Sequence, residues 1–398
     1  MPNKLWSFMV LIALLAIAMP AAAQRPPRVV PDRGDALVGK LPRGYSKLEP
    51  IATDATTAGT IDGSGVGQHK SAKSADLTRI GTLLEAASMT GDTRLVARAD
   101  ALLLRQPVGD GNPNLLRLRA YSAQHKHDFS GAIRLLDALV AVDPRNAGAR
   151  LSRAEIQLVQ GRIHKARTDC RALALGVDAD TGLLCAASLA LRTGEYAAAA
   201  SLLDRLLGEF PPADPRRAFA LLARAEVASR AGETNADTRY QQALAASPGD
   251  IRTRVSYARH LRRVGRDAEV EQVLAGSEQS DTAQLQRTLA AMAAKRSDAQ
   301  ALVAAQARRY AMAHELGSQP EMRDEAEFLL VLKGQPREAL ALALRNFEQQ
   351  RDFEDVDILV RAADTAREPA ALDGLHAWQK AQGLASSNAP RKAIEAKR

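Results

Sequence analysis

The chain contains 398 residues and carries a formal net charge of +8, and only 4% of its residues are aromatic. The positive charge comes mainly from arginines that are scattered without a block of like charge. A moderate positive charge is compatible with acidic partners, nucleic acid or an anionic surface, but this scattered pattern favours a solvated helical surface, and we expect no nucleic-acid partner. Between about residues 75 and 384 there is no run of alternating apolar and polar residues typical of a β-strand, so the sequence argues against a sheet-based fold.

The first 23 residues have the order of a secretory signal peptide. Lys4 gives a basic start, an apolar run follows from Leu5 to Met19, and the small residues Ala21 and Ala23 precede the expected cleavage point after Ala23. The apolar run is short for a membrane span, which needs about 20 residues. We therefore expect a Sec-type signal, a periplasmic or secreted mature protein and no stable membrane span. Retention of the segment as an uncleaved anchor is the alternative.

Residues 24–73 are rich in proline and glycine and have little apolar periodicity, which predicts a disordered linker. Residues 385–398 are polar and basic and are predicted to form a disordered tail. Helical periodicity is almost continuous between these segments, and alanine occupies many helix faces. The sequence thus predicts one helical domain over residues 74–384.

The helices repeat with a period of 34 residues. Ala120, Ala154 and Ser188 follow one another at this spacing in the first helix of successive units, and Ala132 and Ala166 do so in the second helix. Each unit consists of a helix, a glycine-containing bend, a second helix and a stop. This organisation predicts a repeat array in which each unit buries its apolar face against its neighbours.

The stop is clearest in the segment YQQALAASPGD, residues 240–250. Tyr240 and Ala243 share one helix face, and Pro248 ends the helix because it lacks an N–H group. We expect Tyr240 to fill the gap between neighbouring helices.

A 34-residue period with this pattern resembles the tetratricopeptide repeat (TPR). The resemblance also rests on a small residue in a first helix, Ala258, and on the bend glycines Gly161, Gly194, Gly232 and Gly265. Small residues in second helices complete the pattern, at Ala199 or Ala200 and at Ala236. The resemblance covers about residues 77–350. It implies an all-α, right-handed superhelical solenoid of antiparallel helix pairs, and a final pair, around residues 355–367 and 370–382, that caps the array.

The sequence contains no convincing motif for phosphate binding, metal binding or nucleophilic catalysis. The stretch GSGVGQHKS, residues 63–71, lacks the adjacent glycine and lysine and the preceding strand of a phosphate-binding loop. His125, His127 and Asp128 are not accompanied by a complementary cluster of metal ligands. No nucleophile motif such as G-x-S-x-G occurs. We expect no enzymatic activity, no bound cofactor, no metal and no ATP.

The resemblance implies that the first helices line a concave groove for a protein or peptide partner. Arg117, Tyr121 and His125 recur at i, i+4 and i+8 and form one stripe. A second set of candidate binding residues comprises Arg252, Arg259, Arg262 and Arg263. These arginines predict either a solvated face or a groove that binds acidic segments through forked guanidinium groups.

The expected function is that of a non-enzymatic interaction scaffold or adaptor of the bacterial periplasm. A component of envelope polysaccharide export or outer-membrane assembly is one alternative, and a helper in cofactor or cytochrome maturation is another. The sequence names no partner and indicates no oligomeric state.

Cys170 and Cys185 are the only cysteines, and we expect them to form a disulfide in an oxidising compartment. Cys170 lies in the second helix of one unit and Cys185 in the first helix of the next. The turn between these helices centres near residues 177–178, so the two cysteines lie about equally far from it and side by side. Two buried free thiols are the alternative.

Overall fold

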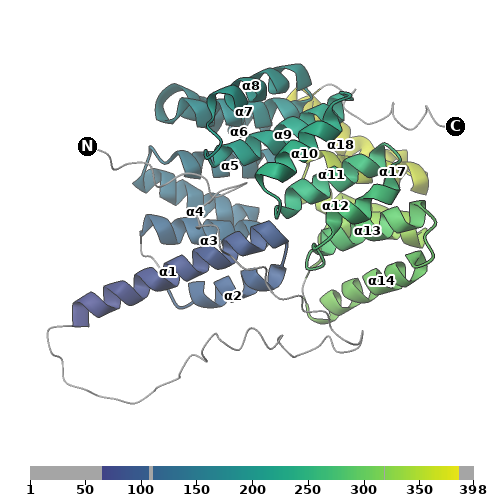
Figure 1. Cartoon of the computed structure of the whole chain (residues 1–398), viewed down its shortest axis with the longest axis horizontal. Coiled ribbons are helices and arrows are strands. Elements are labelled where there is room, and N and C mark those ends of the chain that lie inside the picture. The colour runs from purple at the N-terminus through teal and green to yellow at the C-terminus, as the bar shows by residue number, and fades with distance from the viewer. Residues whose placement is uncertain (1–64, 107–110, 318, 385–398) are drawn as a thin grey trace, which may run out of the picture. The chain divides into compact units, whose positions relative to one another are not determined.

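The computed structural model describes residues 65–106, 111–317 and 319–384. The predicted signal peptide, the predicted linker up to residue 64 and the predicted basic tail lie outside the described residues. All regular elements of the described residues are helices, which succeed one another as side-by-side pairs (Figure 1). The predicted all-α solenoid of helix pairs is confirmed.

The first ten α-helices and one π-helical turn are α1 (Gly65–Thr90), α2 (Thr93–Leu103), α3 (Pro113–His125), α4 (Phe129–Val142), α5 (Ala147–Val159), α6 (Ile163–Ala172), η2 (Leu173–Val177), α7 (Ala179–Thr193), α8 (Tyr196–Glu209), α9 (Arg216–Ala231) and α10 (Ala236–Ala246). The remaining elements are α11 (Ile251–Arg263), η3 (Asp267–Glu269), α12 (Val270–Leu274), α13 (Asp281–Ala293), α14 (Ala299–Glu315), α15 (Met322–Glu327), η4 (Phe328–Lys333), α16 (Pro336–Gln349), α17 (Phe353–Ala366), η5 (Pro369–Leu372) and α18 (Asp373–Gln382).

The linker predicted over residues 24–73 differs from the structure at its end, because α1 already begins at Gly65. After Gly67 the sequence contains no further glycine and no proline up to residue 80. Glutamine, lysine and alanine in that run are good helix formers, and they outweigh the poor start.

Small residues lie where the helix pairs cross. Ala120, Ala154, Ser188 and Ala258 are at most 2% exposed. Small side chains allow neighbouring helix axes to approach to about 8–10 Å. The bend glycines adopt the left-handed conformation that favours glycine, with φ of 68° at Gly161, 81° at Gly194, 71° at Gly232 and 79° at Gly265.

Tyr240 occupies the position expected from its spacing. Its ring stacks on Tyr257 of the next unit with 4.9 Å between the ring centroids, and its hydroxyl lies 2.9 Å from the Ser256 hydroxyl. Helix α10 ends at Ala246, just before Pro248. The aromatic ring therefore joins one unit to the next.

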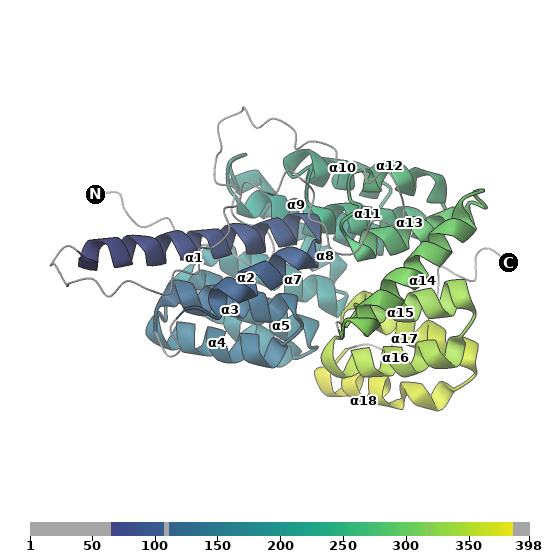
Figure 2. The same ribbon diagram turned by 90° about the horizontal axis from the view of Figure 1, so that it is seen from below.

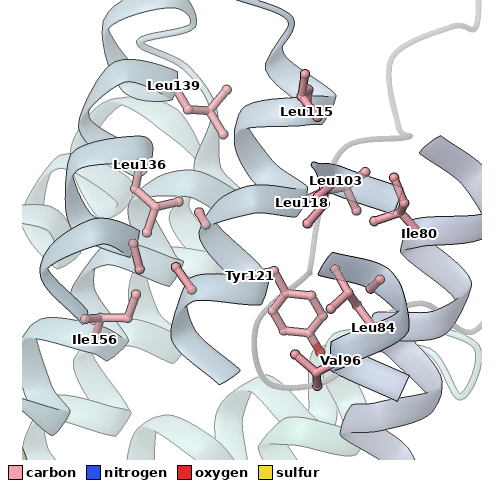
Figure 3. Close-up of a cluster of buried hydrophobic side chains, with 14 of the residues drawn as sticks. Ile80, Leu84, Val96, Leu103, Leu115, Leu118, Tyr121, Leu136, Leu139 and Ile156 are labelled. Carbon is pink, nitrogen blue, oxygen red and sulfur yellow. The ribbon is translucent and has the colours of Figure 1, made fainter. Parts of the chain in front are cut away.

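The N-terminal core is built by helices α1 to α5. Figure 3 shows Leu84, Leu118 and Tyr121 converging with other apolar side chains between these helices. Leu84 is fully buried, and Tyr121 is 8% exposed. This core fixes one end of the Tyr121 side chain while its hydroxyl reaches a polar neighbour in α1.

The last helices contact much earlier ones. Figure 2 shows α15 to α18 gathered together. The backbone N–H of Arg351 donates to the Val159 carbonyl at 2.7 Å, and the indole N–H of Trp378 donates to the Gly161 carbonyl at 3.0 Å. The final pair was predicted only to cap the array. It also packs against the α5–α6 turn, about 190–220 residues earlier.

No helix in the described ranges has both the length and the apolar character that crossing a bilayer requires.

Cys170 and Cys185 form a disulfide between α6 and α7, with their Cα atoms 5.2 Å apart. Both side chains are at most 4% exposed. The chain segments come close here because Gly182 of α7 lies against Ala174 of η2, where a Cβ atom on residue 182 would overlap the Ala174 backbone. The absence of a side chain at Gly182 therefore supports the approach that the disulfide needs.

We expect thiol titration of the unfolded, unreduced protein to detect no reactive thiol. The bridge closes a loop across a separation of 15 residues. Its reduction should lower the free energy of unfolding by about 3 kcal/mol, because the unfolded chain loses the constraint. Two reactive thiols before reduction would contradict the bridge.

Candidate functional site

A cavity of about 350 Å³ opens on the surface formed by the first helices α3, α5, α7, α9 and α11. We call this the inner cavity. Ser88 of α1 completes its wall. The lining side chains therefore come from five successive units of the array and from α1, although each helix contributes only a few of them.

The inner cavity brings together three of the predicted binding residues. Tyr121 and His125 line it from α3, and Arg252 lines it from the start of α11. Arg117, one turn before Tyr121 in the predicted stripe, is half-buried and is not part of the lining. The i, i+4 spacing thus found two neighbouring side chains of the cavity.

Sequence reasoning missed Glu155, Glu226 and Arg192, which also line the inner cavity. The repeat register contains a signal that finds two of them. The signal is the residue six places before the bend residue with positive φ: of the five members from successive units, the first four line the inner cavity. Its members, each given with its bend residue, are Tyr121 (His127), Glu155 (Gly161), Ser188 (Gly194), Glu226 (Gly232) and Arg259 (Gly265).

The aromatic side of the cavity is a small polar cluster. The Ser88 hydroxyl hydrogen-bonds the Tyr121 hydroxyl and lies 3.4 Å from His125 Nε2. The Tyr121 and His125 ring centroids are 4.8 Å apart. Burial, together with the charges of His127 and Arg252, lowers the pKa of His125 to about 4.

A serine beside a histidine invites comparison with nucleophilic catalysis. A histidine with a pKa of about 4 is a weak base at neutral pH. The Ser88 hydroxyl also makes its shorter contact with Tyr121 rather than with the imidazole. In the part of the chain that the structure describes, no carboxylate hydrogen-bonds His125 to orient its ring. The cluster is suited to binding rather than to activating a nucleophile.

Two carboxylates form the acidic side of the cavity. Glu155 is 2% exposed, and burial raises its pKa. Burial also raises the pKa of Glu226, which accepts a hydrogen bond from the Ser256 hydroxyl at 2.9 Å. Burial therefore disfavours the charged form of both carboxylates.

Two arginines of the cavity and His127 make their closest contacts with carboxylates outside the lining. Arg192 Nη2 lies 3.0 Å from Asp352 at the start of α17, and Arg252 Nε lies 2.9 Å from Asp250. The partner of His127 is a third carboxylate, with 3.1 Å between His127 Nε2 and an oxygen of Glu321.

The predicted arginine face differs from the expected open groove. Arg259 Nη2 lies 3.3 Å from Asp324, and Arg262 Nη1 lies 3.4 Å from Glu327. Both carboxylates belong to α15 of the same chain. Arg263 is exposed and donates to the Ser229 hydroxyl at 2.7 Å. Two of these arginines thus bind the protein's own acidic helix, which repeat spacing alone does not reveal.

The start of α17 makes a similar contact with α9. Arg230 Nη2 lies 2.5 Å from Glu354, and its guanidinium stacks on the Phe353 ring at 3.9 Å from the centroid. Glu354 therefore lies in the first turn of α17 and also forms an ion pair with an arginine of α9. No three histidine, cysteine, aspartate or glutamate side chains within the described segments are placed to hold a metal ion.

No model of a known protein family matches the chain, and no curated protein matches it. A solved structure, a human IFIT1 dimer with PPP-AAAA, is similar with a TM-score of 0.44 and 17% sequence identity. The match covers 74% of this chain and 69% of the other.

Replacing Arg230 by methionine should lower the free energy of unfolding by about 3 kcal/mol, because the variant leaves Glu354 partly buried without its cation. Adding Glu354→Gln should recover part of the loss. Urea unfolding measures both effects. As a control, Arg205→Met should cost less than about 1 kcal/mol, because the Arg205–Glu209 pair is exposed. Equal losses for the two arginines would contradict the assigned ion pair.

The lowered pKa of His125 predicts a pH dependence of stability. The unfolded chain binds the proton first, near the ordinary pKa of 6.5, whereas the folded protein binds it only near 4. Stability contributed by neutral His125 is complete above pH 6.5 and is lost as the pH falls toward 4. Between pH 7.5 and pH 5 the wild type should lose about 2 kcal/mol more than His125→Gln.

Urea unfolding at the two pH values tests this, with the exposed His164→Gln as the matched control. The control should keep the wild-type loss. The same loss in His125→Gln as in the wild type would show that the imidazole is not desolvated.

Proposed function

We propose that this chain is a non-enzymatic helical-repeat scaffold that binds a segment of a partner protein on its inner surface, with the inner cavity as the anchoring point. The proposal rests on which helices supply the side chains that line the cavity. Side chains from the first helices of five successive units converge on one space of about 350 Å³. Repeat arrays bind partners along such surfaces because each unit presents one helix to them.

The size and walls of the cavity support a binding role. Small-molecule pockets commonly measure about 300–1,000 Å³ and combine apolar walls with a few placed polar groups. The inner cavity has apolar side chains from α7 and α9, namely Leu191, Phe219 and Leu222, beside its carboxylates and arginines. A space of this size accommodates one long side chain of a partner while the neighbouring helices contact the rest of the segment.

Two observations support a role outside the cytoplasm. The order of residues 1–23 is that of an export signal. The Cys170–Cys185 disulfide is stable in an oxidising compartment and rare in a reducing one. We therefore propose that the scaffold acts in the periplasm or outside the cell.

Site-specific photo-cross-linking in intact cells tests the proposal. The photoreactive residue p-benzoylphenylalanine replaces Phe219, which lines the cavity and is 9% exposed. The matched control carries it at Val142 of α4, which is 57% exposed and outside the cavity lining. We expect a defined protein adduct from the Phe219 position only. No adduct, or the same adducts from both positions, would contradict binding at the inner surface.

A further inference from the structure

We infer that the inner cavity takes a lysine or arginine side chain of the partner, so that the scaffold selects a basic segment. This inference rests on the proposed function and adds the chemistry of the occupant. It is carried by two carboxylates that line the same cavity, the buried Glu155 and the half-buried Glu226, while the arginines around them make their closer contacts with other carboxylates.

The surroundings of Glu155 support the inference more strongly than those of Glu226. It is 98% buried, given an exposed fraction of 2%, and neither of its carboxylate oxygens has a hydrogen-bond partner among the described residues. The nearest cation, Arg192 Nη1, lies 3.9 Å away, and the Ser188 hydroxyl also lies close enough to favour the charged form. A buried carboxylate with such weak contacts to donors is costly, and a ligand that donates hydrogen bonds reduces that cost.

The cations near these two carboxylates make their closer contacts with other carboxylates. Arg192 makes its closer contact with Asp352, at 3.0 Å. Arg230, the cation that lowers the pKa of Glu226 most, lies 2.5 Å from Glu354. Arg252 is paired with Asp250, and the neutral imidazole of His125 adds no positive charge at pH 7. Each of the three arginines thus has a carboxylate within 3.0 Å that is neither Glu155 nor Glu226, whereas the ion pair between Arg192 and Glu155 is 3.9 Å long.

The walls fit a long basic side chain better than a free inorganic cation. Leu191, Phe219 and Leu222 offer apolar contact for a methylene stem, while the carboxylates accept hydrogen bonds from its charged end. An ammonium or guanidinium group supplies several donors at once. An acidic side chain would add a further negative charge beside Glu155 and would find Arg192 and Arg252 already paired.

Selection from a library of random twelve-residue peptides on the full mature chain tests the inference. We expect the enriched peptides to share one lysine or arginine. Replacing that residue by norleucine in a synthetic copy should weaken binding by at least about tenfold, measured by calorimetry, because the lost charge-assisted hydrogen bonds are worth at least that factor.

The matched variants are Glu155→Gln and Glu209→Gln. Glu209 ends α8 with its side chain 48% exposed, and it is absent from the cavity lining. Glu155→Gln should weaken the basic peptide by about tenfold or more, and Glu209→Gln should leave it unchanged. Circular dichroism checks folding, and Glu226→Gln carries the same test if Glu155→Gln fails to fold.

Three outcomes separate the two proposals. Basic peptides that depend on Glu155 or Glu226 support the inference. Enriched peptides with an acidic or apolar anchor, or binding that neither carboxylate affects, would overturn the basic anchor and leave the scaffold function intact. A selection that enriches no peptide would overturn both.

Discussion

Pairing of buried charges is the constraint on which the inner surface of this protein depends. The first helices carry arginines on a face that the last helices cover. A buried arginine without a carboxylate would cost several kcal/mol. The structure meets this requirement with acidic residues of α15 and α17, such as Asp324 for Arg259 and Glu354 for Arg230. The positions of the last helices are therefore determined by charge as well as by apolar contact.

The repeat architecture could be predicted from the sequence because its signals are local. The burial of Ala154 and the positive φ of Gly161 can be predicted from the pattern of a single unit, because both depend only on neighbouring helices. Tyr240 could be placed for the same reason, since it packs against Tyr257 of the adjoining unit. The start of α1 was placed too late, because glycine-rich composition was given more weight than the helix-forming residues that follow Gly67.

The candidate site was only partly predictable. Spacing within one helix predicted that Tyr121 and His125 lie side by side, and both line the cavity. For Arg259 and Arg262 it predicted a solvated face or an open groove, whereas their partners are carboxylates of the same chain about 65 residues later. Nothing local in the sequence shows that α15 would supply those partners. Glu155 was overlooked because it reads as one charge on an ordinary helix. Its significance depends on burial and on the absence of a donor in the described residues, which only the folded arrangement reveals.

The contrast between Glu155 and Asp324 shows how a scaffold of this kind separates stability from binding. Asp324 is 3% exposed and is engaged by Arg259, Arg323 and the Thr282 hydroxyl, so its burial is compensated within the chain. Glu155 is as deeply buried, yet its contact with Arg192 is 3.9 Å long, and neither of its carboxylate oxygens has a hydrogen-bond partner among the described residues. Stability alone would favour an apolar side chain there. A carboxylate retained at that cost is best explained by a ligand that supplies the missing donors, because functional sites are where proteins keep residues that weaken the fold.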